Sequence, residues 1–168
     1  MIKTTEEQIA IPTVVDVPYE FAAGEYMTRG LTELRDNGKF YAVKCPKCKR
    51  VQLPPRIVCA ECHVKNEEWV ELGLEGTLVA FTIMHIPMTD PTTGEPRQPP
   101  FAYGSVRLDG ATSALDHLLN VEPDMEIIWV GMRCKVVLRP KTERIGDLSD
   151  VMYFEPLPGQ KRPGKTNP

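Results

Sequence analysis

Two cysteine pairs constrain this chain more than any other feature of its sequence. Cys45 and Cys48 form one Cys-x-x-Cys motif, Cys59 and Cys62 form a second, and ten residues separate the motifs. Each motif directs two thiolates toward one point, and two such loops on facing hairpins form a tetrahedral four-sulfur site that suits Zn²⁺. We therefore predict a closed, structural metal site, with zinc as the ion and iron as the alternative. A pair of disulfides or a redox-active Cys-x-x-Cys motif are the other interpretations.

The charge of the chain is concentrated in the same segment. The 168 residues carry a net charge of −3, which disfavours a strongly basic nucleic-acid-binding protein. Residues 39–65, however, hold seven basic side chains against one acidic side chain, and four of the five cysteines. Lys44, Lys47 and Lys49 can offset the negative charge of four zinc-bound thiolates. The alternative is a contact surface for phosphate or for an acidic partner.

The segment before the cysteines is predicted to be an arm. Residues 1–18 are expected to be an extended lead-in, and apolar residues at steps of three and four predict a helix over 19–37. Asn37-Gly38 would end this helix. An amphipathic helix in this place either folds back on the main domain or covers a partner. The predicted organisation is an arm over 1–38 and a zinc ribbon over 39–66.

The rest of the chain reads as mainly β. Apolar and β-branched runs predict five strands, at Thr77–His85, Phe101–Leu108, Ala111–Leu119, Met132–Leu138 and Val151–Leu157. Asp109-Gly110 predicts a two-residue hairpin, Glu122–Ile128 a short helix, and the proline-rich residues 86–100 a long exposed loop. Five strands with a short helix between the third and fourth are typical of the OB-fold barrel, here over 67–158. Residues 159–168 are expected to be a disordered tail.

No self-sufficient active site is evident. Cys134 shares its strand face with apolar residues, which predicts a core position and not a nucleophile. His63 follows the fourth cysteine and would be a spare ligand at most, while His85 and His117 have no nucleophile placed beside them. The sequence contains no uncharged apolar stretch of about 18 residues and no signal peptide pattern at its start. We therefore expect a cytoplasmic protein that does not enter membranes.

Several strings resemble a known family, the zinc-ribbon/OB-fold proteins associated with acyl-CoA enzymes. They are FYAVKCPKCKRVQLPPRIVCAEC (40–62), WVELGLEGTLVAFTIMH (69–85), FAYGSVRLDG (101–110) and VMYFEPL (151–157). The resemblance implies a rubredoxin-like zinc ribbon followed by an OB-fold, in a non-catalytic small subunit. In this family the thiolase-superfamily partner supplies the catalytic groups for Claisen or retro-Claisen chemistry. Relatives serve benzoylsuccinyl-CoA thiolases, steroid side-chain aldolases and archaeal acetoacetyl-CoA synthesis.

The same resemblance implies that CoA or acyl-CoA lies at the partner interface, in a hetero-oligomer with two copies of each chain. The candidate contacts for the CoA phosphates are Arg97, Arg107, Lys141 and Arg144, chosen because they fall at the edges of the predicted barrel. The alternative function is a single-stranded nucleic-acid-binding protein, since ribbons and OB-folds both serve that purpose. Residues 66–168 carry ten basic against fifteen acidic side chains, and aromatic residues make up only 7% of the chain; both observations disfavour nucleic acid. A free-standing acyl-CoA hydrolase or lyase is a third hypothesis.

Overall fold

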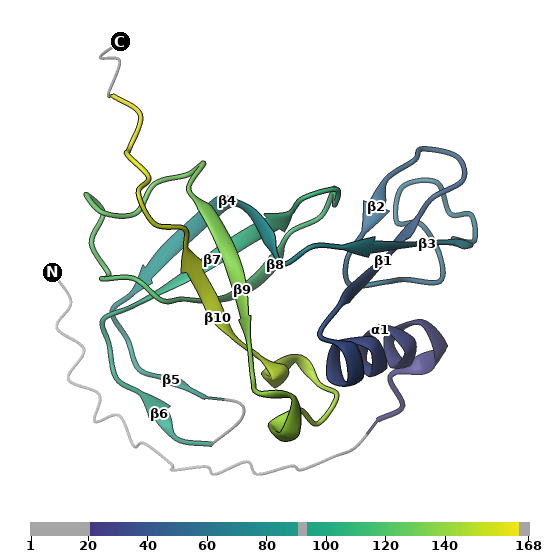
Figure 1. Ribbon diagram of the computed structural model, residues 1–168, viewed down its shortest axis with the longest axis horizontal. Coiled ribbons are helices and arrows are strands. Elements are labelled where there is room, and N and C mark those ends of the chain that lie inside the picture. Colours follow the sequence, from purple (N-terminus) through teal and green to yellow (C-terminus); the bar gives the residue numbers. More distant parts are fainter. Residues whose placement is uncertain (1–20, 91–93, 165–168) are drawn as a thin grey trace, which may run out of the picture.

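The chain folds into a small zinc-ribbon sheet, a closed β-barrel and one α-helix that lies against both (Figure 1). The computed structural model describes residues 21–90 and 94–164. The lead-in predicted for 1–18 therefore lies outside the described residues. Within the described part of the chain, no helix has the length and apolar character needed to cross a membrane.

The ribbon sheet has three antiparallel strands in the order β2-β1-β3. Their bounds are β1 Phe40–Lys44, β2 Val51–Gln52 and β3 Glu68–Leu72. The central strand β1 buries Phe40, Ala42 and Val43, while Tyr41 and Lys44 are partly exposed. This sheet positions the cysteines, because β1 leads directly into the first cysteine pair.

The barrel has five strands and confirms the expected OB-fold architecture. The strands are β4 Glu75–Met84, β7 Phe101–Leu108, β8 Leu115–Leu119, β9 Arg133–Leu138 and β10 Val151–Pro156. They close in the order β10-β8-β7-β4-β9. All pairs are antiparallel except β8 with β10, which are parallel and meet at only one residue pair, Leu119 with Phe154. The closed barrel leaves no free edge strand, but β8 and β10 hold each other weakly.

Three connections differ from the sequence prediction. The two-residue hairpin is wrong: a turn forms at Asp109-Gly110, but β8 begins only at Leu115. The expected helix over Glu122–Ile128 is also wrong, because that segment makes a single hydrogen-bonded turn around Asp124. The loop predicted over 86–100 contains a short hairpin, formed by β5 Met88–Thr89 and β6 Pro96–Arg97.

The missing hairpin has a physical cause in the ribbon. The residues after the turn leave the barrel and bind the ribbon strand β2 and the segment after it. Thr112 donates its backbone N–H to the carbonyl of Val51 at 2.8 Å. The Ser113 hydroxyl accepts from the Leu53 N–H and donates to the Leu53 carbonyl, both at 2.7 Å. These bonds replace the ladder bonds that a tight hairpin would have made.

The helix α1, Gly24–Asn37, folds back on the ribbon and begins five residues later than the predicted Tyr19–Asn37 helix. Its start is fixed by docking: the Tyr26 hydroxyl donates to the buried Asn66 carbonyl at 2.6 Å, and its ring lies 5.1 Å from that of Trp69. The helix ends as predicted, with Gly38 at a left-handed φ of 66°. Gly30 lets the helix approach closely, because a Cβ there would stand 3.1 Å from Pro55.

A single hydrophobic core runs through all three parts. Leu34 of α1, Phe40 and Leu53 of the ribbon, and Leu115 and Phe154 of the barrel belong to one buried cluster. Ribbon, helix and barrel therefore pack as one unit.

The two ends of the barrel's last strand are ordered by specific bonds. Before β10, the connection from β9 holds the short 3₁₀ turns η1 Lys141–Glu143 and η2 Leu148–Asp150. The buried Asp150 carboxylate accepts the Ile145 and Gly146 N–H groups at 2.8 and 2.9 Å. After β10, within the tail predicted over 159–168, the Gln160 amide donates to the Arg133 carbonyl at 2.7 Å. Residues 165–168 lie outside the described chain.

Candidate metal centre and barrel cavity

Cys45, Cys48, Cys59 and Cys62 converge on one point. Their sulfur atoms all lie within 4.8 Å of one another, and the Cys48 and Cys59 sulfurs are 3.7 Å apart. Four sulfurs about 2.3 Å from a tetrahedral zinc ion would be separated by about 3.8 Å. The cluster therefore fits zinc, and all four coordination positions would be filled by protein sulfur. Such a closed site stabilises the fold and has no position for water or substrate.

The two cysteine loops have the same backbone conformation. Cys45 donates its N–H to the carbonyl five residues later at 2.9 Å, and Cys59 does the same at the same distance. The residue after each second cysteine, Lys49 or His63, has a left-handed φ of 64° or 55° and donates its N–H to the first cysteine's carbonyl. His63 thus occupies a turn position and is not part of the sulfur cluster. The repeat of one loop geometry presents the two sulfur pairs to each other.

The thiol environment favours a bound cation. Burial opposes ionisation of Cys45, but hydrogen bonds from the backbone N–H groups of Cys48 and Lys47 outweigh it and lower the pKa of Cys45 to about 6. Burial, together with the thiols of Cys48 and Cys45, raises the pKa of Cys62 to about 12. Without a metal, ionisation of one thiol therefore opposes ionisation of the others. A divalent ion would remove this conflict and displace the thiol protons.

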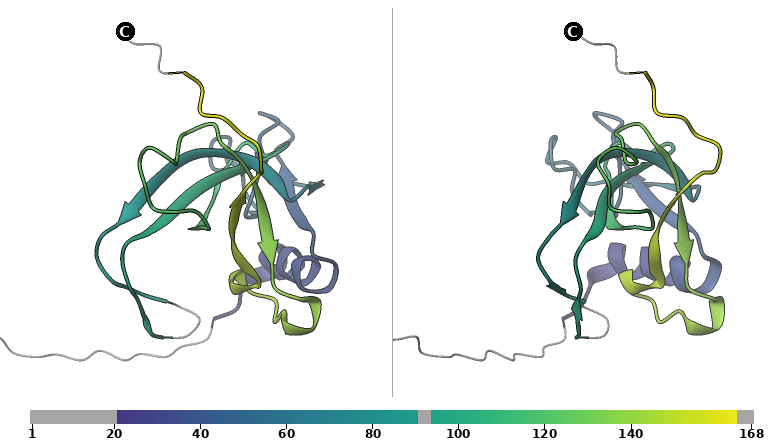
Figure 2. Two further views of the ribbon diagram at one scale, coloured as in Figure 1. Left: turned by 60° about the vertical axis from the view of Figure 1, so that its left-hand side comes forward. Right: turned by 90° about the vertical axis from the view of Figure 1, so that its left-hand side faces the viewer.

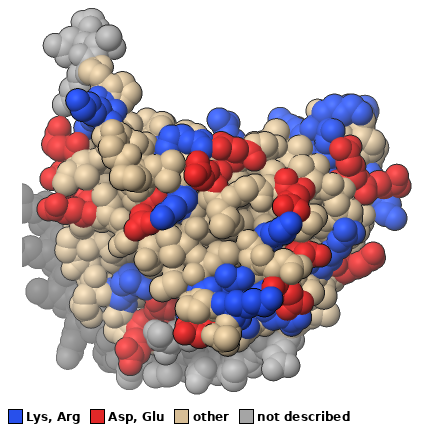
Figure 3. Space-filling view, viewed as in Figure 1, with Lys and Arg blue, Asp and Glu red and all other residues tan. Residues whose placement is uncertain are grey.

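The basic side chains around the metal site are partly neutralised by nearby carboxylates. Lys44 pairs with Glu68 at 3.0 Å and Arg50 pairs with Glu61 at 3.1 Å. The blue cluster at the upper right of Figure 3 lies over this end of the ribbon. Some basic side chains of the ribbon are therefore paired with carboxylates, while its outer surface stays positive.

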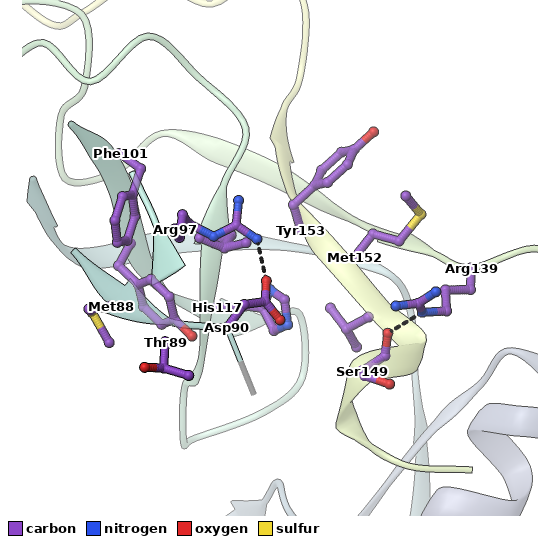
Figure 4. A pocket seen from close by; sticks show the side chains of 13 residues that line it. Met88, Thr89, Asp90, Arg97, Phe101, His117, Arg139, Ser149, Met152 and Tyr153 are labelled. Atoms are coloured by element: carbon purple, nitrogen blue, oxygen red, sulfur yellow. Dashed lines mark hydrogen bonds and ion pairs between the residues drawn. The ribbon is translucent and has the colours of Figure 1, made fainter. Parts of the chain in front are cut away.

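The second candidate site is a cavity of about 320 Å³ in the barrel. It lies among β5, β6, β7, β8 and the start of β10, and is lined by Met88, Thr89, Asp90, Arg97, Phe101, Tyr103, His117, Leu118, Arg139, Ser149, Val151, Met152 and Tyr153. Figure 4 shows Phe101 and Met88 on one side of His117, with Arg139 and Ser149 on the other. The size is that of a small-molecule site.

His117 is a half-buried polar group of this cavity. Burial, followed by the charge of Arg97, lowers the pKa of His117. Its Nδ1 atom is buried and has no hydrogen-bond partner among the described residues. Its ring lies 6.3 Å from the Tyr103 ring and nearly parallel to it. The imidazole thus lies beside an aromatic face with its Nδ1 atom enclosed by the protein.

Neither Cys134 nor His85 joins a site. Cys134 is fully buried in the core, as predicted, and burial raises the pKa of its thiol to about 11. Such a thiol is not a nucleophile at neutral pH. His85 is exposed directly after β4 and does not line the cavity.

The four residues predicted to contact CoA phosphates do not come together. Arg97 lines the cavity and pairs with Asp90 at 2.6 Å. Arg107 is exposed near the opposite end of β7, and Lys141 is exposed in η1.

Arg144 has an internal task. Its Nε atom donates to the Arg139 carbonyl at 2.8 Å, and its Nη1 atom approaches the Leu34 carbonyl of α1 at 3.5 Å. It therefore joins the β9–β10 connection to the carboxyl end of the helix, where a cation is favourable.

Sequence reasoning missed Arg139 and Ser149. Arg139 donates from Nε to the Ser149 carbonyl at 2.7 Å, and both line the cavity. The signal available in the sequence was an arginine at the end of a predicted strand, followed by proline. That pattern does not reveal which strand end faces the β5–β6 hairpin.

Comparison with known proteins finds family models that match residues 32–139, the ribbon and most of the barrel. The family model described as the rubredoxin-like zinc ribbon domain of ChsH2 matches residues 32–68. The model described as the C-terminal OB-fold domain of ChsH2 matches residues 69–139.

Individual relatives are distant. A DUF35 domain-containing scaffold protein of Methanocaldococcus jannaschii is 22% identical over 135 residues, which cover 78% of this chain and 91% of that protein. A solved structure described as the Ltp2-ChsH2(DUF35) aldolase matches with a TM-score of 0.53 at 20% identity, over 81% of this chain and 98% of that one. A DUF35-family protein of unknown function from Sulfolobus solfataricus matches at 24% identity with a TM-score of 0.47, over 66% of this chain and 74% of that one. The aldolase structure supports the fold described above.

Proposed function

Because this chain belongs to the family of zinc-ribbon/OB-fold proteins defined by the two ChsH2 domains, we propose that it is a non-catalytic accessory subunit of a thiolase-type acyl-CoA enzyme. The observation that carries the proposal is the match of the ribbon and most of the barrel over the continuous residues 32–139. A relative of this block is named as part of an aldolase together with Ltp2, and another is named a scaffold protein. The partner would supply the catalytic groups for Claisen or retro-Claisen chemistry.

The chemistry of the described residues supports an accessory role. The metal cluster is closed by four sulfurs, so it offers no Lewis-acid position. Cys134 is a buried thiol with a raised pKa. His117 is the one histidine that lines the cavity, and no hydrogen bond among the described residues joins it to Ser149, the one serine there (Figure 4). The described residues thus provide binding surfaces and not a nucleophile with its base.

In this proposal acyl-CoA is bound where the two subunits meet, in an assembly with two copies of each chain. Arg97 is the CoA candidate with the best support, because it lines a cavity. Arg107 and Lys141 are exposed and would contact CoA only at an interface.

The test is to purify the tagged chain from the cells that produce it and to identify the proteins that accompany it by mass spectrometry. We expect a thiolase-superfamily protein in a stoichiometric amount, and acyl-CoA turnover by the pair that is lost when the partner's nucleophilic cysteine is replaced. The Cys48→Ser variant, purified in the same way, is the control. It tests whether recovery of the partner needs an intact ribbon. Turnover by the isolated chain, lost on His85→Ala, would overturn the proposal.

A single-stranded nucleic-acid-binding protein is the second candidate, favoured by one observation. The barrel cavity brings Phe101, Tyr103 and Tyr153 near Arg97 and Arg139, and aromatic residues beside cations bind unstacked bases. Nucleic acid that accompanies the purified chain, with affinity for oligonucleotides that falls steeply with salt, would favour this function over the first.

A further inference from the structure

The barrel cavity is bordered by large apolar side chains that are exposed. Met88 and Met152 lie on opposite sides of it in Figure 4 and are 40% and 41% exposed. Ile145 and Leu148, in the connection before β10, are 67% and 45% exposed. We call these four side chains the apolar rim. Exposed apolar side chains that gather in one region commonly mark a surface that another segment or another molecule covers.

The apolar rim continues from the cavity to the first turn of α1. Leu148 lines a small apolar hollow together with Met27 and Leu31 of the helix. Ser149 and Val151, which follow Leu148 in the chain, line the barrel cavity. The apolar surface therefore runs from the cavity across η2 to the place where the chain enters α1.

The N-terminal segment of the chain is attached beside this surface. The described chain begins at residue 21, and twenty residues precede it. Figures 1 and 2 show the purple stretch ahead of α1 leaving toward the end of the barrel that carries the β5–β6 hairpin and the 3₁₀ turns. An extended chain spans about 3.3 Å per residue, so twenty residues reach up to about 66 Å. This length is ample to cross the apolar rim and the cavity.

The sequence of this segment complements the rim in its apolar side chains. Residues 9–17, IAIPTVVDV, hold six of them. Proline and β-branched residues disfavour a helix and favour extended chain here. Such a stretch can lay aliphatic side chains on the exposed methionines at the cavity.

The charges are complementary as well. Arg139 lines the cavity and forms no ion pair within residues 21–90 and 94–164. Its Nε donates to the Ser149 carbonyl at 2.7 Å, which orients the guanidinium. Residues 1–20 carry four acidic side chains against one basic side chain, and one of the acids, Asp16, lies within the apolar stretch. A carboxylate is the group that an oriented arginine binds best.

We propose that residues 9–17 of this chain lie across the barrel cavity, with their aliphatic side chains on Met88 and Met152 and the Asp16 carboxylate at Arg139. The occupant is the chain's own segment because it is attached next to the rim, and a short tether gives an effective concentration in the millimolar range. The inference goes beyond the proposed function and does not rest on it, since the cover forms in the isolated chain.

The experiment is hydroxyl-radical footprinting of the zinc-loaded full chain, with the oxidation of each methionine measured by mass spectrometry. Met125, in the β8–β9 connection, is 61% exposed and does not line the cavity, so it serves as the internal reference. The exposures of Met88 and Met152 alone would give them rates within about twofold of the Met125 rate. We expect both to be oxidised about fivefold or more slowly than Met125, because the segment covers them.

Two double variants of equal added charge test whether the apolar stretch forms the cover. Val14→Asp with Val15→Asp should raise oxidation of Met88 and Met152 about threefold or more and leave Met125 unchanged, because charged side chains do not pack on the methionines. Thr4→Asp with Thr5→Asp is the matched control outside residues 9–17 and should change these rates less than about 1.5-fold. Bound zinc, measured in each variant, reports an intact ribbon. Equal effects of the two double variants would overturn the inference.

The ion pair has its own test. Asp16→Arg should raise oxidation of Met88 and Met152 about twofold, the effect of losing one partly exposed pair. Arg139→Glu added to Asp16→Arg should restore the natural rates, because the charges are then exchanged. Unchanged oxidation in Asp16→Arg would overturn the assignment of Asp16 to Arg139.

Other occupants of the rim give different results. Protection that disappears when the chain is diluted from about 50 μM to about 1 μM would assign the cover to a second copy. Protection seen only in the complex with a co-purified partner would assign it to that partner. Either result overturns the inference, and the second one leaves the proposed function standing.

Discussion

His117 makes the stability of the protein depend on pH. Its pKa is lowered in the folded chain, first by burial and then by the charge of Arg97. The unfolded chain therefore takes up a proton near pH 6.5, where the folded chain does not. The contribution of the neutral imidazole is fully present above the unfolded pKa. It is lost as pH falls below that value toward the lower pKa of the folded state.

We expect the midpoint temperature of thermal unfolding to decrease as the pH is lowered from about 7 to about 5. In His117→Gln this decrease should be smaller. His85→Gln, at an exposed position, is the control and should follow the natural chain. Parallel pH profiles for the natural chain and His117→Gln would show that His117 does not titrate with unfolding.

The metal site depends on each of its sulfurs. Cys59 is buried, and its sulfur lies 3.7 Å from that of Cys48. Cys59→Ser should reduce bound zinc, measured by atomic absorption, from about one ion per chain to a small fraction, because a neutral hydroxyl replaces a thiolate ligand. Cys134→Ala, which also removes a buried cysteine, should keep the ion. Equal loss of metal in both variants would mean that general destabilisation, not ligation, holds the ion.

For single residues, the sequence predicts a position correctly where local spacing along the chain determines it. The four cysteines meet because each pair is local and the ribbon brings the pairs together. Cys134 was also predicted correctly, since alternation along one strand assigns it to the core. The cavity residues could not be found in this way. His117 lies on β8 and Arg139 directly follows β9, and they line one cavity only through closure of the barrel, which no local pattern encodes.

The helix α1 is held by one buried hydrogen bond at its start and by packing along its length. Tyr26→Phe removes the bond to the Asn66 carbonyl and should lower the free energy of unfolding by about 1 kcal/mol. Hydrogen exchange of the first turn of α1 should become faster. Tyr41→Phe is the matched control, because its hydroxyl contacts Glu71 at the exposed surface. Unchanged exchange in Tyr26→Phe would show that aromatic packing alone docks the helix.

Elements were predicted well where the pattern is local and poorly where another part of the chain intervenes. All five barrel strands appear near their predicted positions. The tight hairpin failed because Thr112 and Ser113 bind Val51 and Leu53 of the ribbon segment. A turn sequence such as Asp109-Gly110 carries no information about acceptors about 60 residues away. The partner of the helix is also distant in the chain, because Tyr26 bonds to Asn66. The sequence alone therefore left open whether the helix folds back on the main domain.

The whole molecule should respond to loss of its metal as one unit. Because α1, the ribbon and the barrel share one hydrophobic core, removal of zinc by a chelator should lower the unfolding temperature of the entire chain. Differential scanning calorimetry should show a single transition before and after chelation. A metal-free sample with one unchanged transition and one lost transition would show that ribbon and barrel unfold independently.

The contact between Arg144 and the Leu34 carbonyl, separated by 110 positions in the chain, has a consequence for biosynthesis. The helix is made before the ribbon, but the arginine that completes its carboxyl end is made only after the ribbon and most of the barrel strands. Docking of such distant segments is slow compared with local folding. In the nascent chain the helix is therefore only partly secured until the β9–β10 segment has left the ribosome. We expect any partner subunit to bind after the β9–β10 segment has docked on the helix and not before.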